Sequence, residues 1–285
     1  MRVFLTGATG YIGGALAAAL RNRNHEVAAL VRPDADSRRL RDLGVVLLAG
    51  DLEALPSLRD QLENFDAFVH AAQARQNTVE ADRAAVDTFT ALNGFFVYTS
   101  GVWVLGNTND AHESSPVNPL PLVAWRPPHE ELVVGSGGAV LRPGCVYGGK
   151  QSLLADWFAA AQQNRPLQIV GEGTNRWAMV HVDDLVELYA RVLEQQAKGV
   201  LHGIDDSNAS LAEMAHDVAP QGTIEHIPLA AAREKLGPFA DALAVDQHIS
   251  SDDTRRALGW NPRKTFSSSL DEQWREWNAT LEQIR

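Results

Sequence analysis

The chain has 285 residues, of which 45% are hydrophobic and 21% charged, as in an ordinary globular protein. Its formal net charge of −11 at pH 7 disfavours nucleic acid and anionic membrane surfaces as partners. The single cysteine, Cys145, cannot form an internal disulfide, and we find no segment with the composition of a transmembrane helix. We therefore expect a cytoplasmic protein that acts on a small molecule.

Short apolar segments alternate with helical patterns along the first half of the chain. Strands are expected at Val3–Leu5, Val27–Val31, Val45–Leu48, Ala67–His70, Phe95–Thr99 and Ala139–Leu141. Helices are expected at Ile12–Arg21, Ser37–Leu43, Leu55–Leu62, Val79–Leu92 and Glu130–Val134. Continuous apolar strands are typical of a parallel sheet that is buried on both faces. The alternation predicts an α/β fold with a doubly wound parallel sheet, the Rossmann fold.

The pattern changes after Gly149, where the chain becomes richer in helix and carries scattered prolines. One segment, Val182–Leu193, has an apolar stripe at helical spacing and is expected to pack back on the sheet. We predict a dinucleotide-binding domain over residues 1–149, joined by residues 174–204. Residues 150–173 and 205–285 would form a smaller, mostly helical lobe.

A glycine-spaced turn lies between the first expected strand and the first expected helix. Gly7 permits the tight turn, Gly10 allows backbone amides to approach a pyrophosphate, and Gly13 allows close packing of helix on strand. The alternative is a loop with ordinary turn glycines, but the position at the start of a βαβ unit favours a cofactor site. The residues assigned to this site are Gly7, Thr9, Gly10, Tyr11, Ile12 and Gly13.

The end of the second expected strand bears on the choice of cofactor. Arg32 stands there instead of the carboxylate that would hold the ribose of NAD, with Arg38 and Arg39 nearby. This favours NADP over NAD. Two alternatives stay open: Arg32 is a solvated charge, or Asp34 or Asp36 reaches the ribose from the following loop.

Several motifs in order make the chain resemble the extended short-chain dehydrogenase/reductase family, which contains nucleotide-sugar epimerases, dehydratases and dihydroflavonol-type reductases. The motifs are the glycine turn, Gly50-Asp51-Leu52, His70-Ala71-Ala72, Tyr98-Thr99-Ser100-Gly101, Leu141-Arg142-Pro143-Gly144-Cys145-Val146-Tyr147-Gly148 and His181-Val182-Asp183-Asp184-Leu185. The resemblance implies that Asp51 and Leu52 flank the adenine and that Ala71 and Ala72 line the diphosphate-ribose. It places Pro143 to Val146 beside the nicotinamide. It also implies a substrate-binding C-terminal lobe and a homodimer.

The family's Tyr-x-x-x-Lys pair, which moves the proton that accompanies hydride transfer, is missing. No Tyr lies between Tyr98 and Tyr147, and the first Lys is Lys150. Trp125 and His129 stand at the same four-residue spacing in the corresponding region. Trp cannot donate a proton near neutral pH, whereas His129 has the chemistry of a general acid, the alternative being a surface or helix-start histidine.

Three hydroxyls are further candidates for the lost acid. Thr99 and Ser100 lie near the expected nicotinamide edge, and Tyr147 is either a donor or a wall of the pocket. The nine histidines show no paired helical spacing with an acid, so no metal site is expected. We expect an NADP(H)-binding oxidoreductase or epimerase-like enzyme for a small carbonyl or hydroxyl compound. The alternative is a non-catalytic NADP(H)-sensing regulator.

Overall fold

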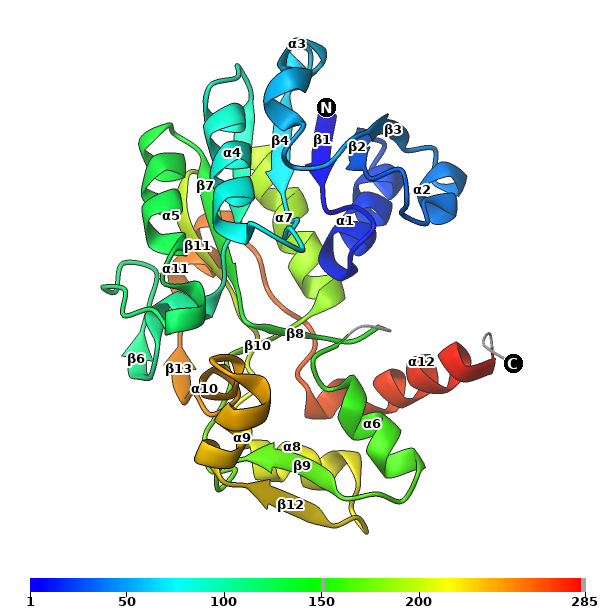
Figure 1. Cartoon of the computed structure of the whole chain (residues 1–285), viewed down its shortest axis with the longest axis vertical. Helices are drawn as coiled ribbons and strands as arrows, with labels where there is room; N and C mark the ends of the chain where they lie inside the picture. The colour runs from blue at the N-terminus through cyan, green and yellow to red at the C-terminus, as the bar shows by residue number, and fades with distance from the viewer. Residues whose placement is uncertain (150–151, 283–285) are drawn as a thin grey trace. The chain divides into compact units, whose positions relative to one another are not determined.

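The computed structural model describes residues 1–149 and 152–282, with side chains as far as Ala279. Seven strands form one sheet, in the order β11-β7-β5-β4-β1-β2-β3 (Figure 1). The strands are β1 (Arg2–Thr6), β2 (Glu26–Val31), β3 (Val46–Ala49), β4 (Ala67–His70), β5 (Phe95–Thr99), β7 (Ala139–Pro143) and β11 (Gly199–Gly203). The six strands from β7 to β3 pair in parallel. The expected Rossmann fold is confirmed.

The register brings the carboxyl ends of the central strands to one level. Thr6 of β1 pairs with His70 of β4, and His70 pairs with Tyr98 of β5. Since ligands of parallel α/β sheets bind beyond the carboxyl ends of the strands, this edge is where a site is expected.

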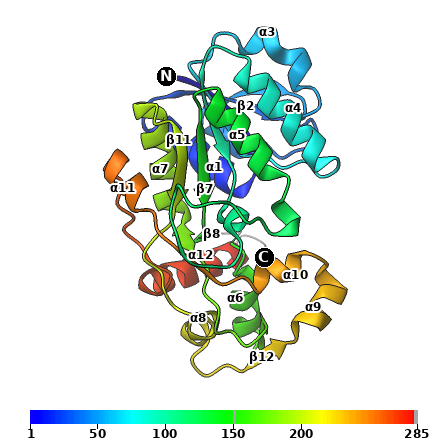
Figure 2. The same cartoon turned by 90° about the vertical axis from the view of Figure 1, so that its left-hand side faces the viewer.

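Helices cover both faces of this sheet. One face packs against η1 (Leu55–Leu58), α3 (Arg59–Leu62), α4 (Thr78–Thr90) and α5 (Arg126–Gly135) through a core that includes Phe4, Phe68 and Phe89. The other face carries α1 (Tyr11–Asn22) and α7 (Val182–Gln195), which are joined by salt bridges from Arg23 to Glu187 and Glu194. Figure 2 shows α4 and α5 on one side of the strands and α7 on the other. The short α2 (Arg38–Asp42) connects β2 to β3.

Two helices differ from the prediction, one in its first residue and the other in its helix type. Helix α5 begins at Arg126 rather than Glu130, because Pro127 and Pro128 occupy the first turn, where the missing amide N–H would have no partner. The expected helix at 55–62 is a 3-10 turn followed by one α-helical turn. The stripe of α7 is buried as expected, with Leu185, Tyr189 and Leu193 fully inaccessible.

The chain divides into two compact units that are both discontinuous in sequence. Unit 1 comprises residues 1–100, 125–142 and 186–201, and unit 2 comprises residues 101–124, 143–185 and 202–285. The domain limits expected from the sequence stay a prediction. Residues 150, 151 and 283–285, at the edges of those limits, lie outside the described residues.

Unit 2 contains short parallel strand pairs and most of the remaining helices. The pairs join β6 (Thr108–Ala111) to β13 (Gln247–Ile249), β8 (Cys145–Tyr147) to β10 (Met179–His181), and β9 (Leu167–Val170) to β12 (Ile224–Ile227). Its helices are η2 (Val102–Leu105), η3 (Pro121–Val123), α6 (Ala155–Gln162), α8 (Leu211–Val218), α9 (Leu229–Leu236), α10 (Phe239–Leu243), α11 (Asp252–Leu258), η4 (Ser267–Ser269) and α12 (Leu270–Glu282).

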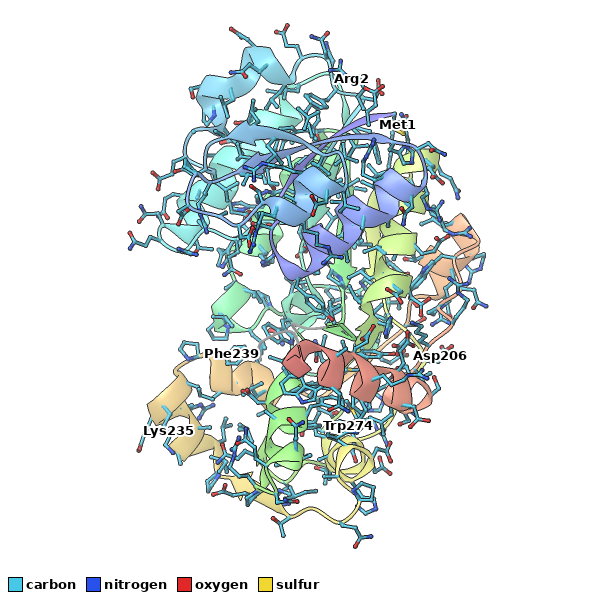
Figure 3. All side chains as sticks on the ribbon, turned by 90° about the vertical axis from the view of Figure 1, so that its right-hand side faces the viewer. Met1, Arg2, Asp206, Lys235, Phe239 and Trp274 are labelled. Atoms are coloured by element: carbon cyan, nitrogen blue, oxygen red, sulfur yellow. The ribbon has the colours of Figure 1, made fainter. Side chains whose placement is uncertain are left out.

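Aromatic packing and capping stabilise unit 2. Trp274 of α12, labelled in Figure 3, packs edge-on against Phe158 of α6 at 4.8 Å between ring centroids. Ser210 and Glu213 form a capping box at the start of α8, which typically stabilises a helix by about 1 kcal/mol. Within the described residues, none of the helices combines the length and the hydropathy needed to span a membrane.

Candidate functional site

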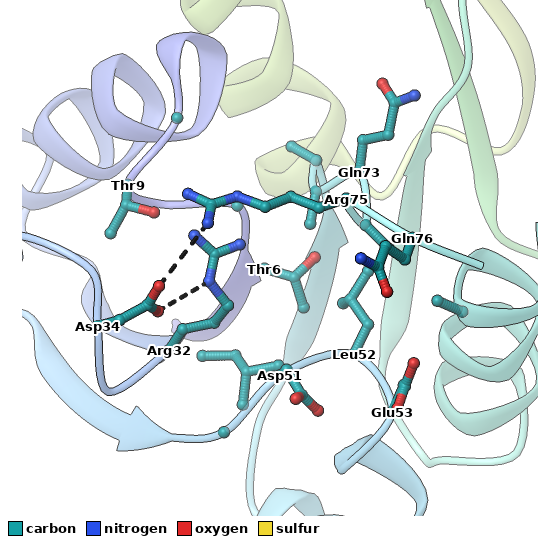
Figure 4. A pocket seen from close by; sticks show the side chains of 18 residues that line it. Thr6, Thr9, Arg32, Asp34, Asp51, Leu52, Glu53, Gln73, Arg75 and Gln76 are labelled. Atoms are coloured by element: carbon teal, nitrogen blue, oxygen red, sulfur yellow. Dashed lines mark hydrogen bonds and ion pairs between the residues drawn. The ribbon is translucent and has the colours of Figure 1, made fainter. Parts of the chain in front are cut away.

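A cavity of about 600 Å³ lies at the carboxyl ends of β1, β2, β3 and β4 in unit 1 (Figure 4). Its size falls within the range of small-molecule and cofactor sites. Its lining residues come from the last residues of β1 and β2, from the loops that follow the four strands and from the start of α4: Thr6, Gly7, Thr9, Gly10, Leu30, Arg32, Asp34, Gly50, Asp51, Leu52, Glu53, Ala71, Ala72, Gln73, Ala74, Arg75, Gln76 and Ala81.

Two glycines of the turn have no room for a side chain. A Cβ on Gly7, which has φ +80°, would lie 2.3 Å from the Ala71 carbonyl oxygen. A Cβ on Gly13 would lie 2.2 Å from the Gly7 carbonyl oxygen, so β1, α1 and the loop after β4 meet at backbone distance. Helix α1 starts after Gly10 with no acidic residue in its first turn, which leaves its positive dipole end available for a pyrophosphate. These residues fit a dinucleotide.

The far end of the cavity holds two guanidinium groups around one carboxylate. Arg32 Nε donates to Asp34 Oδ1 at 3.1 Å, and Arg75 Nη1 lies 3.8 Å from Asp34 Oδ2 (Figure 4). The hydrogen bond and the positive charge of Arg32 lower the pKa of Asp34, which stays ionised. Arg38 does not belong to this cluster, because it forms a bidentate pair with Asp36 and does not line the cavity. The cluster therefore carries a net positive charge.

Most of the predicted cofactor residues meet in this cavity. Those that line it are Gly7, Thr9, Gly10, Arg32, Asp51, Leu52, Ala71 and Ala72. Tyr11, Ile12 and Gly13 form the first turn of α1 and are not among the lining residues. Pro143 and Val146 belong to unit 2.

A buried network of polar side chains lies beside the cavity, centred on Asp82 of α4, which is 3% exposed. Asp82 accepts three hydrogen bonds, from His129 Nδ1 at 2.7 Å, from the Tyr98 hydroxyl at 2.8 Å and from His70 Nε2 at 3.1 Å. His70 Nδ1 lies 2.7 Å from the hydroxyl of Thr6, a cavity residue. The network thus runs from the cavity to the first turn of α5.

The protonation of Asp82 follows from its partners. Burial alone would raise its pKa, but the hydrogen bonds from His129, His70 and Tyr98 outweigh burial and hold the pKa well below its usual range. The ionised carboxylate accepts a hydrogen bond from a ring N–H of each histidine, and this leaves Nδ1 of His70 facing the Thr6 hydroxyl. Burial and the charge of Asp82 raise the pKa of Tyr98, which stays protonated.

Polar groups also gather at the carboxyl end of β5. Arg126 Nη1 donates to the carbonyl oxygen of Thr99 at 2.8 Å, and its guanidinium carbon lies 4.7 Å from the centre of the Trp125 ring. The Thr99 hydroxyl is bonded to the Tyr189 hydroxyl at 2.7 Å. Arg126 therefore holds a permanent positive charge at the end of the strand.

Ser100 follows directly and is 6% exposed. Its amide donates to the Leu141 carbonyl at 2.8 Å, but its buried hydroxyl has no hydrogen-bond partner within the part of the chain that the structure describes. A buried hydroxyl left unpaired costs about 1–3 kcal/mol, so a hydrogen bond from this group to a bound molecule would be favourable.

His129 and Trp125 lie at the start of α5, as neighbours. Their rings are 5.5 Å apart between centroids and meet at 63°. His129 is 4% exposed and lies in the first turn of α5, so it is a helix-start histidine that is buried. Its Nδ1 is bonded to Asp82, which orients the ring.

Tyr147 lies in unit 2 and is fully buried. Its hydroxyl donates to Asp205 Oδ2 at 2.6 Å. Burial, together with the negative charge of Asp205, raises the pKa of Tyr147, while burial raises the pKa of Asp205 to about 6. The hydroxyl proton of Tyr147 is thus held by an internal carboxylate.

Four residues of these clusters were missed in the sequence. Arg75 stands in a polar loop with no motif around it. Arg126 stands between Trp125 and His129, the two residues that were compared with the Tyr-x-x-x-Lys pair. Asp82 offered a signal, since it is an acid among Ala81, Ala85 and Phe89 on the buried face of an amphipathic helix. Tyr189 read as one member of an apolar stripe.

Comparison with known proteins gives two family matches along the chain. Residues 7–110 match the model of an NAD(P)H-binding family, and residues 133–204 match that of the NAD dependent epimerase/dehydratase family. The first match contains the whole cavity except Thr6.

Full-length relatives and a solved structure agree with these matches. The chain is 31% identical to a 3-diazoavenalumate denitrifying reductase of Streptomyces, over 92% of this chain and 96% of the relative. It is 26% identical to a 4-hydroxy-2-methyl-3-oxo-4-farnesyl-3,4-dihydroquinoline-1-oxide ketoreductase of Stigmatella aurantiaca, over 95% of each. A dTDP-glucose 4,6-dehydratase of Bacillus anthracis in complex with NAD has the same fold, with a TM-score of 0.83 and 16% identity over 99% of this chain and 98% of that one.

Proposed function

The chain belongs to the NAD(P)-binding epimerase, dehydratase and reductase family, the extended short-chain dehydrogenases/reductases, and on this premise we propose that it is an NADPH-dependent reductase of a small carbonyl compound. The two reductases to which it is similar are named for a diazoavenalumate and for a farnesylated quinoline. The second name specifies reduction of a ketone, the first names a denitrifying reduction of a diazo compound, and neither refers to a nucleotide sugar. We take the ketoreductase as the guide to a carbonyl substrate.

The preference for NADPH rests on the charges at the far end of the cavity. Arg32 and Arg75 both face Asp34, so the three groups carry one excess positive charge. A 2′-phosphate would replace Asp34 as the partner of both guanidinium groups, because guanidinium binds phosphate oxygens in bidentate fashion. The carboxylate of Asp34 would then face solvent. Asp51, Leu52, Ala71 and Ala72 would contact the rest of the dinucleotide.

The proposed site for the substrate's carbonyl group rests on one observation, the unpaired buried hydroxyl of Ser100. The nicotinamide ring supplies a hydride when the cofactor is bound. Ser100 would then donate a hydrogen bond to the carbonyl oxygen, while the charge of Arg126 would stabilise the negative charge that develops on it. His129, oriented by the bond of its Nδ1 to Asp82, would supply the proton as an imidazolium, with the transferred proton leaving from Nε2 and Nδ1–H staying on Asp82.

The other expected features of the protein are proposals of the same kind. Unit 2 would supply the substrate lobe, with Pro143 and Val146 as contacts of the nicotinamide and Tyr147 as a wall of the pocket. Thr99 would position the end of β5 through its bond to Tyr189. A homodimer and a cytoplasmic location are likewise inherited from the family and the composition.

Deuteride transfer tests the proposal. The protein is incubated with NADPH deuterated at the reactive carbon and with a panel of aryl and alkyl ketones and aldehydes, and alcohols are analysed by mass spectrometry. Transfer to at least one carbonyl is expected, and its loss in Ser100→Ala but not in Ser251→Ala would tie it to the site. Ser251 is a matched control because it is also buried but is hydrogen-bonded to the Ile204 carbonyl.

A second function, NADP(H) sensing without turnover, is favoured by the internal bonds of three candidate donors. Thr99 is bonded to Tyr189, His129 to Asp82 and Tyr147 to Asp205. Tight NADPH binding together with the absence of any deuteride transfer would support the sensor and contradict the reductase.

A further inference from the structure

The ends of β5 and β7 hold two buried polar groups without a partner. They are the Ser100 hydroxyl and Nη1 of Arg142, in side chains whose residues are 6% and 4% exposed. Among the described side chains of unit 1, these are the only buried nitrogen or oxygen atoms that lack a hydrogen bond. Because unpaired buried polar groups are uncommon in folded proteins, the position of these two needs an explanation.

The pairing of the two strands makes Ser100 and Arg142 neighbours. Thr99 pairs with Leu141, and the Ser100 amide extends this ladder by one bond, to the Leu141 carbonyl at 2.8 Å. Successive side chains of a strand point to opposite faces of the sheet. Thr99 contacts α7 on one face, so Ser100 points to the other face, where Arg142 contacts α5. Both unpaired groups therefore lie on the same face of adjacent strand ends.

The guanidinium group of Arg142 is held in place along one edge only. Its Nε donates to Glu130 Oε1 at 3.1 Å and its Nη2 donates to Glu130 Oε2, which makes a bidentate pair. Glu130 is as buried as Arg142, at 4% exposure. The remaining nitrogen, Nη1, can only donate, whereas the Ser100 hydroxyl can donate or accept. Together the two residues offer at least two donors to one oxygen atom.

The charges around these donors balance. Asp82, Arg126 and Glu130 all act on the pKa of the neighbouring Tyr98 hydroxyl, and Arg142 adds the second cation. Two cations and two anions thus meet here. A permanent anion would find no net attraction at this place, and its burial would cost desolvation free energy. A carbonyl oxygen fits better, since it is uncharged when it binds and becomes negative only during reduction.

From these observations we propose that Arg142 Nη1 and the Ser100 hydroxyl form a two-donor site for the carbonyl oxygen of an uncharged aldehyde or ketone. The inference rests on the proposed reductase function and adds Arg142 as the second donor. When hydride adds to the carbonyl carbon, the oxygen becomes an alkoxide, which takes its proton from His129. Ser100 and Arg142 keep their own protons and stabilise the alkoxide by hydrogen bonds.

The aldehyde 4-(dimethylamino)cinnamaldehyde tests the proposal, because its absorption band moves to longer wavelength when its carbonyl oxygen accepts hydrogen bonds. It is titrated into the full chain in the presence of NADP⁺, which cannot reduce it. We expect a red shift with the wild type, a smaller shift with Ser100→Ala and with Arg142→Lys, and none with the double variant. No shift with the wild type, or a full shift with Arg142→Lys, would overturn the proposal.

Controls separate the lost donor from a damaged fold. Lysine keeps a charge for Glu130 but has no second nitrogen. Arg23→Lys is the matched variant, because Arg23 also pairs with glutamates of unit 1, and it should keep the full shift. If thermal unfolding shows that Arg142→Lys does not fold, Arg142→Met combined with Glu130→Met removes both charges together, which often leaves stability unchanged. This double variant should show the same reduced shift, and a full shift would overturn the proposal.

The balance of charges is tested with a second ligand. The carboxylate 4-(dimethylamino)cinnamate has the same skeleton as the aldehyde and carries a permanent negative charge. In competition with the aldehyde it should bind at least tenfold more weakly. Equal or tighter binding would show a site for a permanent anion and contradict the assignment to a carbonyl group.

Deuteride transfer distinguishes failure of this inference from failure of the reductase. In Arg142→Lys, kcat/KM should fall about 100-fold, the effect of losing one donor to a developing oxyanion. Transfer that Arg142→Lys leaves unchanged would contradict the role of Arg142 and leave the reductase standing. A red shift that depends on Ser100 and Arg142, without any transfer, would contradict the reductase and support the two-donor site.

Discussion

Two regions of unit 1 are built by different means. The turn after β1 uses backbone geometry, since Gly7 and Gly13 bring three segments to backbone distance and leave a helix start for a pyrophosphate. The end of β5 uses side chains, with Ser100, Arg126 and the network of Asp82 drawn from four separate elements. A backbone requirement leaves glycines at fixed spacing, while a side-chain requirement can be met by many residues in many orders.

The largest effect is expected at the backbone end. Gly7→Ala forces φ +80° on a residue with a Cβ that would lie 2.3 Å from the Ala71 carbonyl oxygen, which should cost about 5 kcal/mol of unfolding free energy. Urea unfolding and an NADPH titration should show a strongly destabilised protein without measurable binding. Gly135→Ala is the matched control, because nothing lies within 4 Å of its Cβ position, and it should change stability by less than about 1 kcal/mol. Equal effects would contradict this account of the turn.

A smaller effect is expected in the buried network. Asp82→Asn removes the charge that holds His129 and His70 and should cost about 3 kcal/mol of unfolding free energy. Because the pKa of Asp82 is lower in the folded than in the unfolded state, its stabilisation is complete above the unfolded value of about 4. That stabilisation is lost as the pH falls toward the folded pKa.

Thermal unfolding between pH 6 and pH 2.5 checks the sign. The wild type should lose stability with acidification more steeply than Asp82→Asn, since the variant has no carboxylate to protonate at this position. Parallel curves would mean that Asp82 is not the ionised centre of the network.

Removal of the Ser100 hydroxyl should lower activity without lowering stability. In Ser100→Ala, kcat/KM for the carbonyl substrate should fall about 100-fold, the effect of losing one donor to a developing oxyanion. Stability should stay constant or rise slightly, because the hydroxyl is unpaired in the folded protein. Ser251→Ala should instead lose about 1 kcal/mol of stability with normal activity, since that hydroxyl donates to Ile204. A stability loss in Ser100→Ala would show that its hydroxyl already has a partner.

The same contrast explains how much of the fold and of the site could be predicted from the sequence. The order of apolar strands and the spacing of Gly7, Gly10 and Gly13 were enough for the sheet and for one half of the cavity, because both depend on local rules of burial and backbone geometry. Arg32 could be found at the end of β2, but its neighbour Arg75 could not, since the two meet only when β1 and β4 pair beside β2.

The start of α5 could not be predicted for a related reason. Two prolines suggested a helix that begins after them, and the structure places them inside its first turn. This shift turns His129 inward to Asp82 and brings Arg126 to Thr99. The partners come from α4 and β5, and no spacing rule connects them along the chain.

The most direct test of the central claim is a fluorescence titration of the wild-type protein with NADPH and with NADH, repeated on Arg32→Ala, Arg75→Ala and Arg38→Ala. We expect NADPH to bind at least tenfold more tightly than NADH. This preference should fall about 10-fold in Arg32→Ala and in Arg75→Ala, because a lost phosphate contact costs about 1.4 kcal/mol of binding free energy. Arg38→Ala should keep it, because Arg38 pairs with Asp36 outside the cavity. Tighter binding of NADH would contradict the NADPH assignment, and failure to bind either would contradict the site itself.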